Sequence, residues 1–183
     1  MDKIRDSADI LQPEKEETYQ FIEKLLSSVK ENFSTNRVHI GMDEAVMLGL
    51  GNYLKENGYK KGSLIIREHC NRVVDICRKL ELKPMIWSDM YITANSTGGY
   101  YDLPENTDCS KWEKPKKDLG LVYWDYYHAD TRTYEKMLDI HAQLSDNVIF
   151  AGGSWIWNGI SPNYSKTYAC TKAALFTCKK YNI

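Results

Sequence analysis

The feature that most constrains the fold is the regular alternation of short apolar segments with longer segments of helical periodicity. Strands that are separated by helices indicate a parallel sheet with right-handed crossovers. We therefore predict an α/β fold in which one helix is followed by four strand–helix units. The predicted strands span residues 37–43, 84–89, 119–126 and 148–155, and the main predicted helices span residues 13–32, 64–80, 131–144 and 164–181.

The chain has 183 residues, which is enough for one domain with a sizeable core. No Pro- or Ser-rich linker divides it, and it shows no repeat beyond the strand–helix alternation. Residues 1–12 are mostly polar, so we expect a flexible N-terminus followed by a single domain over residues 13–183. Residues 91–118 show no periodicity, and loops of this length are usually functional or disordered.

The composition excludes several classes of partner. With 24 basic and 25 acidic residues the net charge is −1, so no basic surface suggests nucleic acid or an anionic membrane. The sequence contains no run of about 18 apolar residues and its charged N-terminus is unlike a signal peptide. The five cysteines form no Cys-x-x-Cys pair, which is typical of reduced thiols. We expect a cytoplasmic protein with neither a nucleic-acid nor a membrane partner.

The first predicted strand, residues 37–43, ends on two adjacent carboxylates, Asp43 and Glu44. The carboxyl ends of parallel strands are where α/β enzymes place their chemistry. A simpler interpretation is that Asp43 caps the following helix and Glu44 lies in its first turn, near the positive end of the helix dipole.

The other predicted strand ends carry more carboxylates and several aromatic side chains. They form the pairs Trp87 with Asp89, Tyr123 with Asp125, and Trp155 with Trp157. The set contains no Ser-His-Asp arrangement, no Gly-rich phosphate loop and no cluster with metal-ligand spacing. Carboxylates with aromatic walls suit the cleavage of a glycosidic bond, which needs an acid for the leaving oxygen and stabilisation of an oxocarbenium-like centre.

Residues 39–44, His-Ile-Gly-Met-Asp-Glu, resemble the His-x-Gly-x-Asp-Glu signature of glycoside hydrolase family 20, the β-N-acetylhexosaminidases. Residues 85–90, 122–125 and 152–157 resemble later strand ends of the same catalytic barrel, in the same order. The similarity extends from about Thr18 to the C-terminus.

The resemblance implies a parallel (β/α) barrel of the TIM type. A complete barrel needs about 250 residues, so four β/α units would form only about half of one. Such a half-barrel has two unpaired sheet edges, which is a liability for a soluble protein. We therefore expect a homodimer in which two chains close an eight-stranded barrel.

The resemblance also implies a retaining, substrate-assisted mechanism that requires no metal and no cofactor. In this mechanism the 2-acetamido carbonyl of the substrate attacks the anomeric carbon and an oxazolinium intermediate forms. Glu44 would be the general acid and then base, Asp43 would hold the acetamido N–H, and Tyr123 would donate to the acetamido oxygen. Tyr126 could exchange roles with Tyr123.

The remaining candidates would bind the N-acetylhexosamine of a glycan or glycoside. Trp87 and Trp157 would form walls around the acetamido group and the sugar face, with Trp155 as the alternative to Trp157, and Asp125 would accept a sugar hydroxyl. His39 would support Asp43 by hydrogen bonding, although an isolated histidine is more often a satisfied buried group. The tryptophans could also be core residues.

Two departures from the family pattern weaken recognition of the sugar hydroxyls. No strand before His39 supplies the arginine that grips them, and Asn158 and Gly159 follow Trp157 where the family often has a glutamate. The departures suggest weak affinity or a relaxed choice between N-acetylglucosamine and N-acetylgalactosamine. Three alternatives stay open: a non-catalytic sugar-binding remnant, an inactive fragment of a longer hexosaminidase, and a conventional two-carboxylate glycosidase that uses Glu44 and Asp125.

Overall fold

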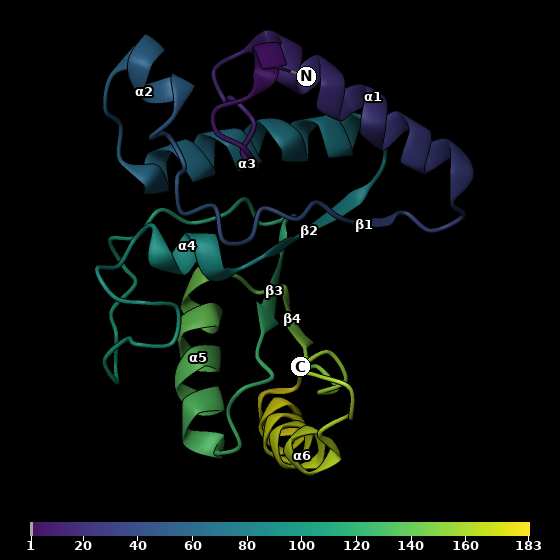
Figure 1. Cartoon of the computed structure of the whole chain (residues 1–183), viewed down its shortest axis with the longest axis vertical. Coiled ribbons are helices and arrows are strands. Elements are labelled where there is room, and N and C mark those ends of the chain that lie inside the picture. Colours follow the sequence, from purple (N-terminus) through teal and green to yellow (C-terminus); the bar gives the residue numbers. More distant parts are fainter. Residues whose placement is uncertain (1) are drawn as a thin grey trace.

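The structure, a computed structural model, describes residues 2–183 and contains a four-stranded parallel sheet in the order β1-β2-β3-β4 (Figure 1). This confirms the α/β class and the parallel order of the strands. In the described chain, β1 pairs only with β2 and β4 only with β3, so both edges of the sheet are unpaired. The strands are β1 (Arg37–His39), β2 (Lys83–Trp87), β3 (Gly120–Trp124) and β4 (Val148–Ala151).

Helices cover one face of this sheet. In Figure 1, α1 and α3 lie beside the β1–β2 half, and α5 and α6 lie beside the β3–β4 half. The helices are η1 (Asp2–Ile4, a 3-10 turn), α1 (Glu16–Asn32), α2 (Asn52–Asn57), α3 (Gly62–Lys79), α4 (Asp89–Thr93), α5 (Thr131–Leu144) and α6 (Tyr164–Tyr181).

Two of the predicted helices begin where a side chain caps them. The Asp130 carboxylate accepts the backbone N–H of Thr133 at 2.8 Å and fixes the start of α5. The Asn163 side chain accepts the N–H of Lys166 at 3.0 Å and fixes the start of α6. By contrast, no side chain caps α3, which begins at Gly62, and within residues 2–183 the buried Ser63 hydroxyl has no hydrogen-bond partner.

The first strand is shorter than predicted. It ends at His39, although Ile40 still donates its N–H to the carbonyl of Met85 at 2.8 Å. Beyond that point the φ angles of Gly41 and Met42 are 72° and 70°, and left-handed backbone cannot continue a strand. The carboxylates therefore lie in a turn beyond the strand.

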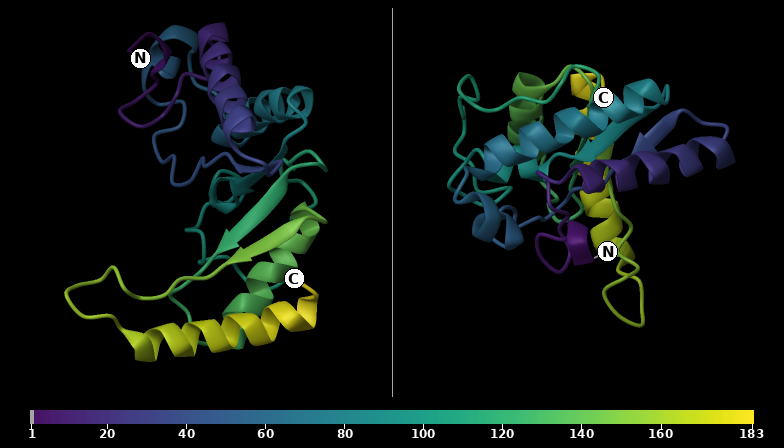
Figure 2. Two further views of the ribbon diagram at one scale, coloured as in Figure 1. Left: turned by 90° about the vertical axis from the view of Figure 1, so that its right-hand side faces the viewer. Right: turned by 90° about the horizontal axis from the view of Figure 1, so that it is seen from above.

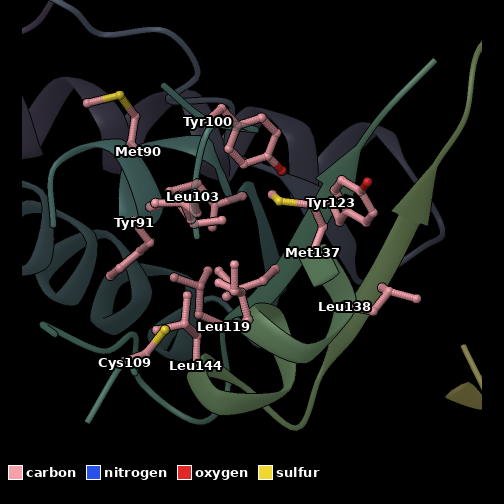
Figure 3. Close-up of a cluster of buried hydrophobic side chains, with 14 of the residues drawn as sticks. Met90, Tyr91, Tyr100, Leu103, Cys109, Leu119, Tyr123, Met137, Leu138 and Leu144 are labelled. Atoms are coloured by element: carbon pink, nitrogen blue, oxygen red, sulfur yellow. The ribbon is translucent and has the colours of Figure 1, made fainter. Parts of the chain in front are cut away.

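The main core lies between the sheet and the helices. Ile86 of β2, with Leu121 and Tyr123 of β3, is fully buried against α3 and α5. Figure 3 shows Tyr123 in one cluster with Met137 and Leu138 of α5. A second cluster joins α1 to α3 through side chains that include Tyr19, Ile22, Leu26, Val73 and Ile76.

The N-terminal segment is packed, whereas the sequence suggested flexibility. Asp6 is 3% exposed, and its carboxylate accepts the backbone N–H groups of Gly49 and Tyr53 at 3.0 and 2.6 Å. A Cβ on Gly51 would lie 2.1 Å from the Asp6 carbonyl oxygen, so only glycine permits this approach. One buried carboxylate thus joins the N-terminal segment to Gly49 and to the first turn of α2. Met1 lies outside the described residues.

A buried hydrogen-bond chain links β2 to α5. The His141 ring donates from Nδ1 to the Met137 carbonyl at 2.6 Å, which leaves Nε2 to accept from the Ser88 hydroxyl at 2.7 Å. The Tyr100 hydroxyl then donates to the Ser88 oxygen at 2.8 Å. Burial lowers the pKa of His141 to about 4, in accord with a neutral ring in this chain.

All five cysteines are free and buried. Burial raises the pKa of every one of these thiols, to about 12 for Cys70 and about 11 for Cys77. None of the helices in residues 2–183 is long and apolar enough to cross a membrane.

The depressed pKa of His141 predicts a loss of stability in mild acid. In the unfolded chain this ring binds a proton below about pH 6.5, whereas in the folded chain it stays neutral down to about pH 4. From pH 7.5 to 5.0 this should lower the free energy of unfolding by about 2 kcal/mol, measured by urea denaturation. His141→Gln keeps an acceptor for Ser88 but does not titrate, so its decrease should be smaller. An equal decrease in both proteins would contradict the prediction.

Candidate active site

The open face of the sheet carries the aromatic side chains of the candidate site. Alternation along β2 and β3 turns Trp87 and Trp124 away from the helices, and Trp87 is paired in register with Val122. Further down the same face, a Cβ on Gly120 would lie 3.2 Å from the Met85 side chain. Because Gly120 has no side chain, the Met85 side chain can pack against β3 directly below the two indoles.

These indoles line a cavity of about 240 Å³ at the carboxyl ends of β1, β2 and β3. Three of the predicted site residues, Asp43, Glu44 and Trp87, meet in it. The complete lining is Asp43, Glu44, Trp87, Trp124, Tyr126 and Tyr127.

The turn after β1 presents both carboxylates to this cavity. Asp43 and Glu44 are exposed, and Glu44 itself has a left-handed φ of 47°. The next helix, α2, begins only at Asn52, so Asp43 does not cap a helix and Glu44 does not lie in a first helical turn. The structure excludes the simpler interpretation of the pair.

Burial and the charge of the carboxylate pair shift the pKa values of two neighbouring groups, His39 and Tyr126. The His39 ring lies 4.3 Å from Trp87, and its Nδ1 accepts the Gly41 N–H at 3.1 Å. Burial lowers the pKa of His39 and the Asp43 charge opposes that shift, so the neutral ring is favoured at neutral pH. Burial raises the pKa of Tyr126, with smaller contributions from Tyr127 and Glu44, so the Tyr126 phenol stays protonated and able to donate.

Tyr123 and Asp125 do not lie in the cavity, which corrects their expected placement. Tyr123 is fully buried among core aromatics, and its hydroxyl donates to the Asp125 carboxylate at 2.8 Å. Asp125 is 1% exposed, and it also accepts from the Tyr127 N–H at 2.9 Å and bonds the His128 ring at 2.8 Å. Strand alternation is the cause, because Trp124 occupies the open face and its neighbours must turn the other way.

The two tryptophans after β4 differ in exposure. Trp155 is 9% exposed, its indole N–H donates to the Tyr126 carbonyl, and Lys166 lies 3.7 Å above its ring. Trp157 is 51% exposed and meets Tyr126 edge-on at 5.3 Å. Both lie on the segment between β4 and α6, which projects from the body in Figure 2. Trp155 therefore anchors the Tyr126 segment, while Trp157 extends the aromatic wall.

Sequence reasoning missed Trp124 and Tyr127 as lining residues. The available signal was the run Tyr-Trp-Asp-Tyr-Tyr over residues 123–127, in which every second residue faces the same side while the strand lasts. Both faces of β3 are apolar, so the pattern alone did not say which residues face the helices.

Two carboxylates lie together in an aromatic cavity at the carboxyl ends of parallel strands, which makes this cavity the candidate active site. A sequence model described as the glycosyl hydrolase family 20 catalytic domain matches residues 2–139. The chain therefore belongs to glycosyl hydrolase family 20 and is a glycoside hydrolase of hexosamine-containing glycans. The match begins before the resemblance noted above and ends before Trp155 and Trp157. A comparison with curated proteins finds no match.

The buried bond between Tyr123 and Asp125 predicts a structural cost for Tyr123→Phe. Removing a hydroxyl that donates to a buried carboxylate should lower the free energy of unfolding by about 1–3 kcal/mol. Urea denaturation measures the loss. Tyr126→Phe is the matched control, because this ring is only half-buried and should change stability by less than about 0.5 kcal/mol. Equal losses in the two variants would contradict the assignment.

Proposed function

We propose that the chain is a retaining exo-β-N-acetylhexosaminidase that uses its substrate's acetamido group as the nucleophile. The observation that carries the proposal is the adjacent pair Asp43 and Glu44 in a cavity walled by Trp87 and Trp124. The family membership supports it, because the family's catalytic domain acts on hexosamine substrates.

In the first step Glu44 donates a proton to the glycosidic oxygen while the acetamido carbonyl oxygen attacks the anomeric carbon. The carbon–oxygen bond to the leaving group breaks and an oxazolinium ion forms. Asp43 holds the acetamido N–H and balances the positive charge that develops. In the second step Glu44 takes a proton from water, which attacks the same carbon and reopens the ring.

The aromatic side chains orient the sugar in this proposal. Trp87 and Trp124 lie against the sugar and its acetamido methyl, and Trp157 extends that wall. Tyr126 takes the role first expected of Tyr123 and donates to the acetamido oxygen, since its phenol lines the cavity and faces both carboxylates.

A conventional pair formed by Glu44 and Asp125 fits the geometry poorly. Asp125 is buried, and its oxygens are occupied by Tyr123, Tyr127 and His128. A nucleophile or base on the second side of a sugar must reach the substrate. The acetamido group removes the need for a second protein nucleophile.

Hydrolysis of 4-nitrophenyl β-N-acetylglucosaminide by the purified chain tests the proposal. Glu44→Gln should lower kcat about 10²- to 10⁴-fold, because it removes the general acid and base. Glu31→Gln, an exposed carboxylate at the end of α1, is the matched control and should leave kcat unchanged. A folded parent chain without turnover, or equal rates in the parent and Glu44→Gln, would contradict the proposal.

The unpaired edges of the sheet suggest how the site is completed. Beside β1 lies a groove of about 480 Å³ lined mostly by apolar side chains of α1 and residues 38–48. At the other edge α6 exposes Tyr168, Leu175 and Phe176. Each edge thus combines open strand hydrogen-bonding groups with apolar surface that a partner could cover.

We propose that a second copy covers both edges, with β4 of each chain paired to β1 of the other. Two identical contacts of this kind close on themselves and give an eight-stranded barrel. Because α6 follows β4 and α1 precedes β1, the pairing sets the apolar side of α6 beside the exposed Leu25 of α1.

Sedimentation at low micromolar concentration tests this assembly and should give twice the mass of the chain. Replacing Leu175 and Phe176 together by Lys should shift the protein toward the monomer, because it puts charge into an apolar contact. Lys179→Ala, on the same helix, should leave the mass unchanged. A well-folded parent monomer under these conditions would rule out the closed pair.

A further inference from the structure

The backbone that carries the carboxylate pair is held in an uncommon conformation. Met42 and Glu44 have φ angles of 70° and 47°, and Gly41 between β1 and Met42 has 72°. Left-handed backbone is unfavourable for residues with a side chain and persists where neighbouring contacts hold it. A turn that presents a reacting group in this conformation needs such a contact at the group itself.

Asp89 supplies that contact. Its Oδ2 accepts the backbone N–H of Glu44 at 2.8 Å, and its Oδ1 accepts the indole N–H of Trp124 at 3.3 Å. The residue is 3% exposed and is the first residue of α4, two residues after the end of β2. One buried carboxylate therefore joins the turn after β1, the start of α4 and the last residue of β3.

The residue before Asp89, Ser88, is fixed by hydrogen bonds to the core. It donates its backbone N–H to the Val122 carbonyl at 3.0 Å, and the Ser88 hydroxyl is fixed between Tyr100 and His141. These contacts immobilise the peptide that carries Asp89. The carboxylate is thus placed by the core and not by solvent.

A carboxylate is a costly choice at this position. Burial raises the pKa of Asp89, with the bonds from Glu44 and Trp124 opposing the shift and the charge of Asp43 adding to it. Ionised, it offers one oxygen to each of its two donors. An asparagine in the same place has a single acceptor oxygen and would turn its NH₂ against the other donor.

We propose that Asp89 is a positioning residue, which holds Glu44 through its backbone N–H so that the Glu44 carboxyl stays in line with the glycosidic oxygen. The inference rests on the proposed role of Glu44 as general acid and base. Displacement of a reacting group by about 1 Å can lower the rate about 10²-fold, so the position of the Glu44 peptide should affect the rate strongly.

Two substrates of different leaving-group ability test the proposal with Asp89→Asn. The sugar leaving group of N,N′-diacetylchitobiose needs the proton from Glu44, whereas 2,4-dinitrophenolate departs without it. We expect kcat for the disaccharide to fall about 10- to 100-fold and kcat for the dinitrophenyl glycoside to fall less than about 3-fold. KM should stay within about 2-fold for both, because Asp89 is not among the residues that line the cavity of the candidate site.

Glu44→Gln should show the same dependence on the leaving group, and combining it with Asp89→Asn should add little further loss, since both changes act on one proton transfer. Asp146→Asn, an exposed carboxylate before β4, is the matched control and should leave both substrates unaffected. A merely structural role for Asp89 would lower both substrates by the same factor, which overturns the proposal.

Amide hydrogen exchange gives a readout that needs no activity. The Glu44 N–H should be protected in the parent chain and should exchange faster in Asp89→Ala, while amides of α5 keep their protection. A parent Glu44 amide that exchanges at the rate of free peptide overturns the inference and leaves the proposed function intact. A parent chain that protects this amide yet cleaves neither substrate overturns both.

Discussion

Which side of β3 faces the helices decides what the cavity contains. The packing of Tyr123 against Tyr134 and His141 of α5 fixes that choice, with ring centroids 6.2 and 4.9 Å apart. Trp124 must then face the open side, where its indole reaches Asp89, and Asp89 in turn reaches the backbone of Glu44. The aromatic contact in the core thus helps to determine, through two hydrogen bonds, the position of the Glu44 backbone.

Much of the framework could be predicted from the sequence. The bounds of α5 and α6 match the predicted helices, and the structure shows that the side chains of Asp130 and Asn163 cap their starts. The alternation of strands and helices was enough to predict a parallel sheet. The meeting of Asp43, Glu44 and Trp87 followed from their positions at strand ends.

Other features depend on contacts between distant residues, which periodicity does not encode. The early end of β1 requires left-handed backbone at Met42, a residue that gives no local sign of it. The orientation of β3 could not be derived because its two faces are equally apolar, so Tyr123 and Asp125 were expected in the cavity that Trp124 and Tyr126 line. The order of residues 2–12 depends on Asp6 meeting a loop more than forty residues away.

The reactivity of the buried thiols can report local opening of the core. Because burial both shields these sulfurs and raises their pKa values, a thiol reagent can modify the native chain only when a part of the core opens. Cys77 lies between α1 and α3, whereas Cys178 lies in the cluster between the sheet and α5. The order in which the two become labelled would distinguish loosening of the N-terminal helices from loosening of the C-terminal half, without any introduced probe.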